Sequence, residues 1–311
     1  MKKVLITGGT GLIGKALTQE LTARGYGVII LSRSQPPATA RRNAAVEYAR
    51  WNINEGTIDK DALQAADYIV HLAGANVGEG RWTATRKKEI VDSRTRSARL
   101  LVKALQETPN KVQAVISSSA IGWYGADRPG GRPFEEGAPA DGSFLGTTCR
   151  QWEESIDPVA GLGIRLVKLR TGIVLSNRGG AYAEFKKPLH MGVASILGTG
   201  DQVVSWIHIS DIVGLYLFAL ENEQVQGVYN AVAPEPVTNR QLVLAMARAR
   251  NRFYLPVKAP GIALKVLLGE MSVEVLKSAT VSSKKAERAG YQFRFPNIGV
   301  AVKNLSINEG N

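Results

Sequence analysis

The chain has 311 residues, of which 44% are hydrophobic and 21% charged, the composition of an ordinary globular protein. Its 39 basic and 27 acidic residues give a net charge of +12, but the basic residues are scattered and form no aromatic-interleaved motif. We therefore expect a solvated basic surface and no nucleic-acid partner. A single cysteine excludes an internal disulfide, and no apolar run is long enough for a signal peptide or a membrane span. These features predict a cytoplasmic protein with no membrane partner.

Short apolar runs alternate with helical patterns through the first half of the chain. The runs are 4–6, 28–31, 68–72, 112–117 and 164–169, and the clearest helices between them are 12–24 and 84–105, ended by Gly25 and Pro109. Continuous apolar strands separated by helices indicate a parallel sheet that is covered on both faces. The predicted fold class is therefore α/β, with a Rossmann-type doubly wound parallel sheet whose ligand crevice lies at the carboxyl ends of the strands.

The second half of the chain has a less regular pattern. Glycines and prolines interrupt it, helical patterns return at 211–221 and 239–249, and the last segment carries apolar helices and a short aromatic strand at 291–295. We interpret this half as a smaller C-terminal α/β substrate domain that closes over the crevice. The predicted domains are 1–170, with some interleaving of later strands, and 171–311.

A glycine-rich turn, Thr7 to Gly14, lies between the first strand and the first helix. Gly8 permits the tight turn, Gly11 lets a pyrophosphate approach the helix N-terminus, and Gly14 allows the helix to pack closely on the sheet. This strand–turn–helix setting predicts a dinucleotide site. The residues expected to contact the cofactor here are Gly8, Thr10, Gly11, Leu12, Ile13 and Gly14.

The end of the second strand distinguishes between the two nicotinamide cofactors. An NAD site usually places an acid there to accept from the ribose 2′-hydroxyl, whereas this chain has Ser32 and Arg33. A guanidinium pairs well with a 2′-phosphate, and a serine can donate to it. We therefore expect NADP(H) as the cofactor. The alternative for Arg33 is an exposed loop arginine without a ligand.

Several motifs resemble the extended, epimerase/dehydratase branch of the short-chain dehydrogenase/reductase superfamily. They are the glycine turn itself, His71-Leu72-Ala73-Gly74, Ser117-Ser118-Ser119 with Trp123-Tyr124-Gly125, and Trp206 to Asp211. Further stretches resemble the atypical, epimerase-like SDR39U1-type subfamily of that branch: Arg81-Trp82, Ser93-Arg94, Cys149 to Glu153, Leu169 to Gly172, and Tyr291 to Phe293. A C-terminal segment at 253–305 is similar to a domain of unknown function, DUF1731.

This resemblance implies a wider set of cofactor contacts. By similarity, the residues near the nucleotide are Ser32, Arg33, Leu72, Ala73, Gly74, Glu89, Arg94, Ser117 and Val174. Arg94 would add positive charge near the phosphates, and Glu89 would accept from a ribose hydroxyl or orient Arg94. The alternative for these two is an exposed ion pair on one helix.

The resemblance also implies a tyrosine four residues before a lysine as the acid/base pair, and this pair is missing. Alignment on Glu153 places Leu145 at the tyrosine and Cys149 at the lysine. Leucine has no proton to transfer, and a neutral thiol carries no positive charge. The catalytic candidates are therefore Ser119 and Tyr124. Ser118 is the alternative serine for the hydrogen-bonding role. Their structural alternatives are a serine that satisfies backbone groups at a strand end and a packed tyrosine with a paired hydroxyl.

The cysteine and the histidines predict no metal site. Cys149 is expected to be a buried hydrophobe, because no histidine nearby would activate it. His71 and His208 are expected to be structural, with Asp211 capping the following helix, and His190 is a candidate for facing a substrate. The three histidines are too dispersed to form a metal cluster.

Together these patterns predict an NADP(H)-dependent oxidoreductase or nucleotide-sugar-epimerase-like enzyme. Its expected partner is a small polar or anionic substrate, and it is expected to be a monomer or a homodimer. Because the nicotinamide itself carries the hydride chemistry, the missing pair does not exclude turnover. The alternative is a non-catalytic NADP(H)-binding sensor or regulatory protein.

Overall fold

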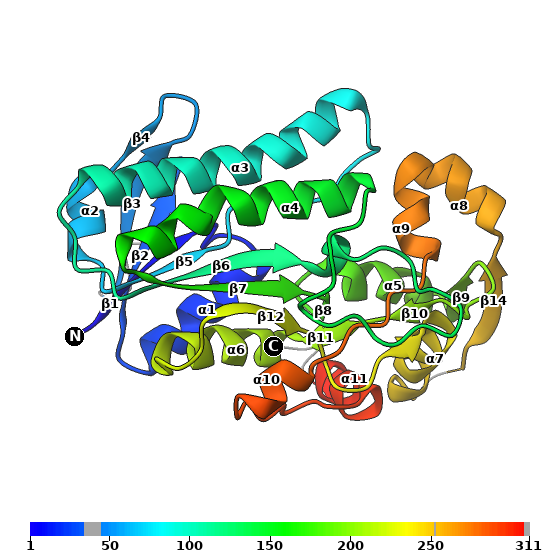
Figure 1. Ribbon diagram of the computed structural model, residues 1–311. Coiled ribbons are helices and arrows are strands. Elements are labelled where there is room, and N and C mark those ends of the chain that lie inside the picture. The colour runs from blue at the N-terminus through cyan, green and yellow to red at the C-terminus, as the bar shows by residue number, and fades with distance from the viewer. Residues whose placement is uncertain (34–44, 252, 308–311) are drawn as a thin grey trace.

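The computed structural model describes residues 1–33, 45–251 and 253–307, and its central feature is an eight-stranded sheet (Figure 1). The strand order is β12-β7-β6-β5-β1-β2-β3-β4, and every pair is parallel except β3 with β4. This confirms the predicted α/β class with a Rossmann-like sheet. The strands are β1 (Lys3–Thr7), β2 (Gly27–Ser32), β3 (Val46–Asn52), β4 (Thr57–Ile58), β5 (Tyr68–His71), β6 (Ala114–Ala120), β7 (Arg165–Thr171) and β12 (Gly227–Ala231).

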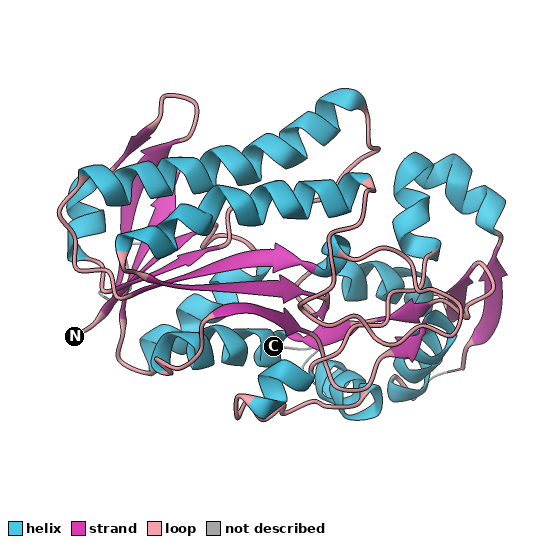
Figure 2. Ribbon diagram, viewed as in Figure 1, coloured by secondary structure: helices cyan, strands magenta, loops and turns pink. Residues whose placement is uncertain are grey.

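Helices cover both faces of this sheet, as Figure 2 shows. One face carries α2 (Lys60–Ala65), α3 (Ala84–Glu107) and α4 (Phe144–Ile156), and the other carries α1 (Leu12–Ala23) and α6 (Ile209–Glu221). Helices α3 and α4 lie side by side (Figure 1). The sheet is therefore doubly wound, and its strands are buried on both sides.

Alternate residues of each strand enter one of two hydrophobic cores. Ile6 and Val167 pack in the core under α1 and α6, whereas Leu5, Ile69 and Leu166 pack in the core under α2, α3 and α4. This two-sided burial explains why these strands appear in the sequence as continuous apolar runs.

The sheet contains three strands that the sequence pattern did not predict. Strand β3 has only Trp51 fully buried, because it lies near the sheet edge beside the two-residue β4. Strand β12 comes from the second half of the chain and pairs with β7. Later elements therefore do contribute to the large sheet, whereas the boundary at residue 170 stays a prediction.

The remaining elements form a smaller α/β part with its own core around Tyr182, Trp206 and Leu242. Its strands form three two-stranded sheets, β10 with β13, β11 with β8, and β14 with β9. Three 3-10 segments of the described residues, η2 (Ile121–Trp123), η3 (Asp157–Leu162) and η4 (Gly269–Met271), connect other elements. The elements are β8 (Ile173–Leu175), α5 (Gly180–His190), β9 (Val193–Leu197), β10 (Val203–Val204), β11 (Trp206–His208), β13 (Val237–Thr238), α7 (Asn239–Ala249), β14 (Leu255–Ala259), α8 (Gly261–Leu268), α9 (Ser272–Leu276), α10 (Lys284–Arg288) and α11 (Ile298–Ile307).

Two local predictions for the second half are wrong. Residues 291–295 form no strand, because Asp211 accepts hydrogen bonds from the backbone N–H groups of Arg294 and Phe295 at 2.8 and 3.0 Å. Asp211 does not cap α6 either: the cap is His208, whose Nδ1 accepts from the Ser210 N–H at 3.1 Å. The aromatic alternation at 291–295 therefore reflects rings that pack on α6, such as Tyr291.

Across the three described ranges, the longest apolar helices fall short of what a membrane crossing requires.

Candidate functional site

In the glycine-rich turn, backbone segments approach one another so closely that a side chain would not fit at two of the glycines. Gly8 has a φ of +70°, and a Cβ there would lie 2.8 Å from the carbonyl carbon of Leu72. A Cβ on Gly14 would lie 2.5 Å from the Gly8 oxygen. Gly11 is the N-cap of α1, and no side chain caps this helix or adds an acid to its first turn. The backbone N–H groups at the start of α1 are thus left for an anionic ligand.

A buried chain of hydrogen bonds holds this turn against β5 and α3. Thr7 Oγ1 accepts from the N–H groups of Leu72 and Ala73 at 3.1 and 3.2 Å, so its own proton points to His71 Nδ1 at 2.8 Å. His71 Nε2 then donates to Ser97 Oγ at 3.3 Å. Burial lowers the pKa of His71 to about 4, which keeps the ring neutral. The expected structural role of His71 is confirmed.

An open pocket of about 690 Å³ lies over the carboxyl ends of β1, β2, β3 and β5, a size typical of small-molecule sites. It unites the glycine turn with the end of β2, where Ser32 is half-buried and Arg33 exposed. Nine predicted cofactor residues line it: Gly8, Thr10, Gly11, Ser32, Arg33, Leu72, Ala73, Gly74 and Glu89.

The pocket also contains residues that the sequence reasoning missed. They are Leu31, Trp51, Asn52, Ile53, Asn54, Ala75, Asn76, Glu79, Arg86, Asp92, Ser93 and Arg96. On α3 the spacing of Arg86, Glu89, Ser93 and Arg96 is three, four and three residues, which places them on one helix face and was a usable signal. The residues at 51–54 lie at and after the end of β3, and because that strand was not predicted, no signal pointed to them.

On the α3 side of the pocket, charged side chains form ion pairs with one another. Arg86 pairs with Glu89 at 2.6 Å and with Glu79 at 3.7 Å. The alternative prediction of a Glu89–Arg94 pair is therefore wrong, because Glu89 is held by Arg86 one turn earlier. At the end of β2 the lining residues are Ser32 and Arg33, with no acid in that stretch of sequence.

Six predicted cofactor residues lie outside the pocket wall in the described structure, Arg94 among them. Leu12, Ile13 and Gly14 form the first turn of α1, where Ile13 packs against the core and Leu12 lies beside Gly180. Ser117 is buried and donates to the Ser118 carbonyl at 3.2 Å. Val174 is half-buried on β8. Their contact with a nucleotide stays a prediction.

Arg94 lies on α3 just behind the pocket wall, on the side that faces α4. Its Nη1 donates to the carbonyl oxygens of Ala75 and Ile90 at 3.1 and 3.0 Å. Its guanidinium carbon lies 4.9 Å from the ring centre of Trp152 and 3.1 Å from where a Cβ on Gly74 would be. Burial lowers the pKa of Arg94, and no carboxylate in the described ranges pairs with it.

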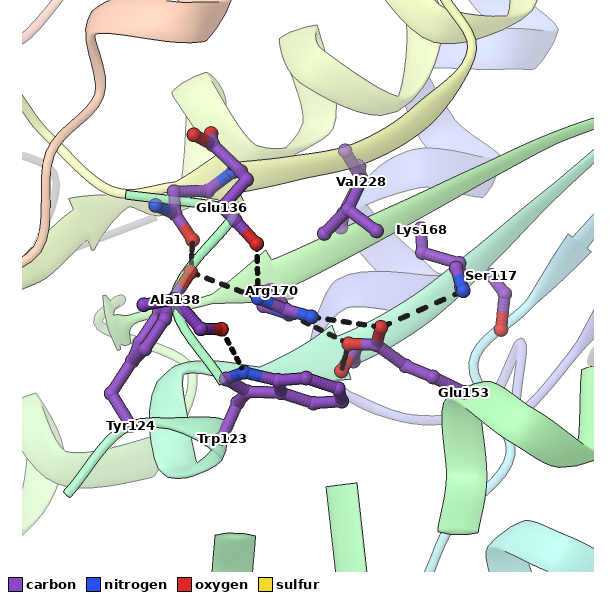
Figure 3. A network of polar contacts seen from close by, with 12 residues as sticks. Ser117, Trp123, Tyr124, Glu136, Ala138, Glu153, Lys168, Arg170 and Val228 are labelled. Atoms are coloured by element: carbon purple, nitrogen blue, oxygen red, sulfur yellow. Dashed lines mark hydrogen bonds and ion pairs between the residues drawn. The ribbon is translucent and has the colours of Figure 1, made fainter. Parts of the chain in front are cut away.

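A buried polar network lies at the carboxyl ends of β6 and β7 and is shown in Figure 3. Glu153 on α4 and Arg170 on β7 form a two-point ion pair, with Nε–Oε1 at 2.8 Å and Nη2–Oε2 at 3.1 Å, and their side chains are 4% and 3% exposed. Ser119 Oγ donates to Glu153 Oε1 at 2.7 Å. The Arg170 guanidinium also lies over the Trp123 ring, 3.6 Å from its centre. This network fixes the end of β6 and the η2 turn together.

Tyr124 belongs to the same network. It is fully buried, and its hydroxyl donates to Asn230 Oδ1 at 2.7 Å and accepts from Arg170 Nη1 at 3.1 Å. Its ring stacks on Phe134, and burial raises its pKa. This geometry supports the structural alternative for Tyr124, a packed tyrosine with a paired hydroxyl. Ser119 is also buried and paired, but with the Glu153 carboxylate and not with the backbone groups that its structural alternative named. Among the three catalytic candidates, Ser118 is half-buried rather than sealed.

Leu145 and Cys149 lie beneath the η2 turn, where a Cβ on Gly122 would contact both. Burial raises the pKa of Cys149 to about 12, which confirms the expected buried thiol. His190 is exposed at the end of α5, with its Nδ1 3.1 Å from an Arg250 nitrogen, and it does not line the pocket. In the portion of the chain that the structure describes, no group of three or more potential ligands could hold a metal ion.

Comparison with known proteins adds to this geometry. Residues 4–231 match the NAD dependent epimerase/dehydratase family, and 259–305 match a domain of unknown function, DUF1731. The epimerase family protein ML0860 of Mycobacterium leprae is 34% identical, with 96% of this chain and 94% of that protein covered. The crystal structure of human epimerase family protein SDR39U1 (isoform 2) with NADPH has a TM-score of 0.87 at 31% identity, covering 98% and 99% of the two chains. A nucleoside-diphosphate sugar epimerase from Corynebacterium glutamicum has a TM-score of 0.76 at 30% identity, covering 98% of this chain and 58% of that one.

Proposed function

Because the chain belongs to the NAD-dependent epimerase/dehydratase family, we propose that it binds NADP(H) in the pocket over β1, β2 and β5. We further propose that it is an oxidoreductase or epimerase-like enzyme acting on a small polar or anionic substrate. One observation carries the cofactor choice: Ser32 and Arg33 line the same pocket as the glycine turn. The NADPH in the human relative's structure is consistent with this choice.

The pocket residues fit such a cofactor. A Cβ would fill the cradle at Gly8, and the first turn of α1 has no capping side chain. The diphosphate would be held at Gly11 and the 2′-phosphate at Ser32 and Arg33. Leu72 would offer apolar surface to the adenosine. When bound, the nicotinamide supplies the hydride chemistry.

The chain's own contribution at the reacting end is mainly one of positioning. The Glu153–Arg170 pair holds Ser119 and Tyr124 by their hydroxyls, so these two shape the η2 turn rather than exchange protons with a substrate. Ser118 is the candidate left for hydrogen bonding to a substrate oxygen, because the residue is half-buried whereas Ser119 and Tyr124 are fully buried. We propose this role for Ser118.

A cofactor titration tests the binding proposal. The wild-type protein should bind NADPH more tightly than NADH, and Arg33→Ala should remove most of the difference, a loss of roughly 10- to 100-fold for one charged phosphate contact. Arg128→Ala, an exposed arginine outside the pocket, is the matched control and should change neither affinity. Equal wild-type affinities for the two cofactors would contradict the proposal.

The sealed hydroxyls of Ser119 and Tyr124 favour one rival, a non-catalytic NADP(H)-binding sensor or regulatory protein. Loss of NADPH absorbance across a panel of carbonyl substrates distinguishes the two. Turnover that falls in Ser118→Ala would support the enzyme. Tight NADPH binding with no turnover on any member of the panel would favour the sensor.

A further inference from the structure

Helix α8 presents an apolar face to solvent, the reverse of the usual arrangement in a globular protein. Ile262, Val266 and Leu267 are 78%, 68% and 69% exposed. Ile262 and Val266 are four residues apart and so lie on the same side of the helix. The inner side carries Leu264, which is buried, and Leu268, which is half-buried. Single exposed apolar residues need no explanation, but a whole helix face of them indicates an interaction surface.

More exposed apolar residues lie in and beside the adjoining strand β14. Phe253 is 88% exposed, and Leu255 and Val257 are 57% and 41% exposed. The Leu255 N–H donates to the Gly192 carbonyl at 2.8 Å, which brings β14 beside the exposed Met191. Figure 1 shows β14 and α8 at the outer edge of the smaller α/β part, away from the eight-stranded sheet. We call the exposed apolar side chains of β14 and α8, with Phe253, the end surface.

The open edge of β14 is unsuited to pairing with another strand. The N–H of Leu255 and the carbonyl of Ala259 form their hydrogen bonds on the side of β9. Because backbone groups alternate along a strand, those of Pro256 and Lys258 point to the opposite edge. Proline has no N–H to donate, and a lysine on an edge strand opposes pairing. This edge therefore disfavours an added strand, including β14 of a second copy.

The charges on the end surface are of one sign. All charged residues between positions 251 and 269 are basic, and Lys258 and Lys265 are exposed. The next acids along the chain, Glu270 and Glu274, are each paired with a lysine. The whole chain has a net charge of +12. A second copy would bring like charges together, whereas an anionic surface would neutralise them.

We propose that the end surface binds an anionic lipid bilayer. Ile262, Val266 and Leu267 enter the boundary between headgroups and acyl chains, and Lys258 and Lys265 reach the headgroup phosphates. With eight residues, α8 is too short to cross a bilayer, so this association is peripheral. The expectation of no membrane partner rested on the length of apolar runs, which bears on spanning and not on surface binding. The proposal does not depend on the NADP(H) site.

Co-flotation of the full chain with lipid vesicles tests the apolar contribution. At low salt the protein should bind vesicles of phosphatidylcholine mixed with phosphatidylglycerol but not vesicles of phosphatidylcholine alone, and the bound fraction should fall as salt is raised. Ile262→Gln/Val266→Gln should lower the partition coefficient for the mixed vesicles roughly 10- to 100-fold. The control Val300→Gln/Ile307→Gln, which removes two exposed apolar side chains of α11, should leave it within about twofold. No binding by the wild type, or an equal loss in both pairs, would overturn the proposal.

A second pair of variants separates the position of the charge from its amount. Lys258→Gln/Lys265→Gln should lower the partition coefficient roughly tenfold. Lys60→Gln/Lys103→Gln removes two exposed lysines of α2 and α3, so it lowers the net charge equally, and the expected loss is less than about threefold. Equal losses in the two lysine pairs would mean that overall charge attracts the protein to the vesicles, which contradicts a role for the end surface.

A second copy of the chain is the competing occupant, and sedimentation equilibrium tests for it. A dimer that dissociates in Ile262→Gln/Val266→Gln, together with no vesicle binding by the wild type, would assign the end surface to self-association and refute the proposal. Thermal melting followed by circular dichroism shows whether each variant is folded, and Ile262→Ala/Val266→Ala is the second apolar pair if the glutamine pair is not. Because α8 does not line the nucleotide pocket, vesicle binding without NADPH binding would contradict the proposed function alone.

Discussion

The Glu153–Arg170 pair gives the most demanding prediction about the site's architecture. In Glu153→Gln the amide keeps the shape of the side chain but removes the carboxylate that is bonded to the buried Arg170 guanidinium. Two opposite charges about 4 Å apart interact by about 4 kcal/mol at an effective dielectric constant of 20. Removing one partner of a buried pair costs about 3–5 kcal/mol in measured cases. Because the oxygen of the new amide would still accept from Ser119, we expect a loss of about 3 kcal/mol, at the lower end of this range.

Urea unfolding followed by circular dichroism measures this loss. The neighbouring Glu154→Gln is the matched control, since Glu154 pairs with Arg150 at 3.9 Å with both side chains more than half exposed. Such a surface pair contributes about 1 kcal/mol at most. A Glu153→Gln protein as stable as Glu154→Gln would refute the view that this pair holds β6, β7 and α4 together.

Three further predictions concern the turn, the buried histidine and the C-terminal segment. Gly8→Ala should abolish measurable NADPH binding or unfold the turn, because its Cβ would lie 2.8 Å from the Leu72 carbonyl carbon at a φ of +70°; unchanged affinity in a titration would contradict this. His71 has a folded pKa of about 4 against 6.5 for the free group, so the unfolded chain takes up a proton first. The protein should therefore lose up to about 3 kcal/mol of stability as pH falls from 6.5 to 4, a loss that is smaller in His71→Gln when denaturant unfolding is compared at the two pH values. Asp211→Ala should raise amide exchange at Arg294 and Phe295, whose N–H groups it accepts; unchanged exchange there would show that the segment is held by ring packing alone.

Much of the nucleotide-binding fold could be predicted because its signals are local. Buried parallel strands are apolar on both faces. In the glycine turn, positions 8 and 14 accept only glycine, because a Cβ there would collide with the backbone. Helix ends were similarly clear, as Gly25 adopts a φ of +81° just after the end of α1. Strand β3 was missed because it lies near the sheet edge and carries polar residues that resemble a loop.

The reacting end of the site could not be predicted because its geometry depends on contacts between distant residues. Nothing near Tyr124 in the sequence shows that its hydroxyl meets Asn230 and Arg170, 106 and 46 residues away. The same holds for Arg94, whose environment is made by Trp152 on another helix. The chemical types of the side chains identified the candidates, but only their contacts with α4, β7 and β12 show that the hydroxyls of Ser119 and Tyr124 are paired and buried.

A crystal structure of this protein with NADPH tests the central claim most directly. We predict the 2′-phosphate within hydrogen-bond distance of Ser32 and Arg33 and the diphosphate at the glycine turn. A 2′-phosphate away from Arg33, or a nucleotide bound outside the pocket over β1, β2 and β5, would contradict the account.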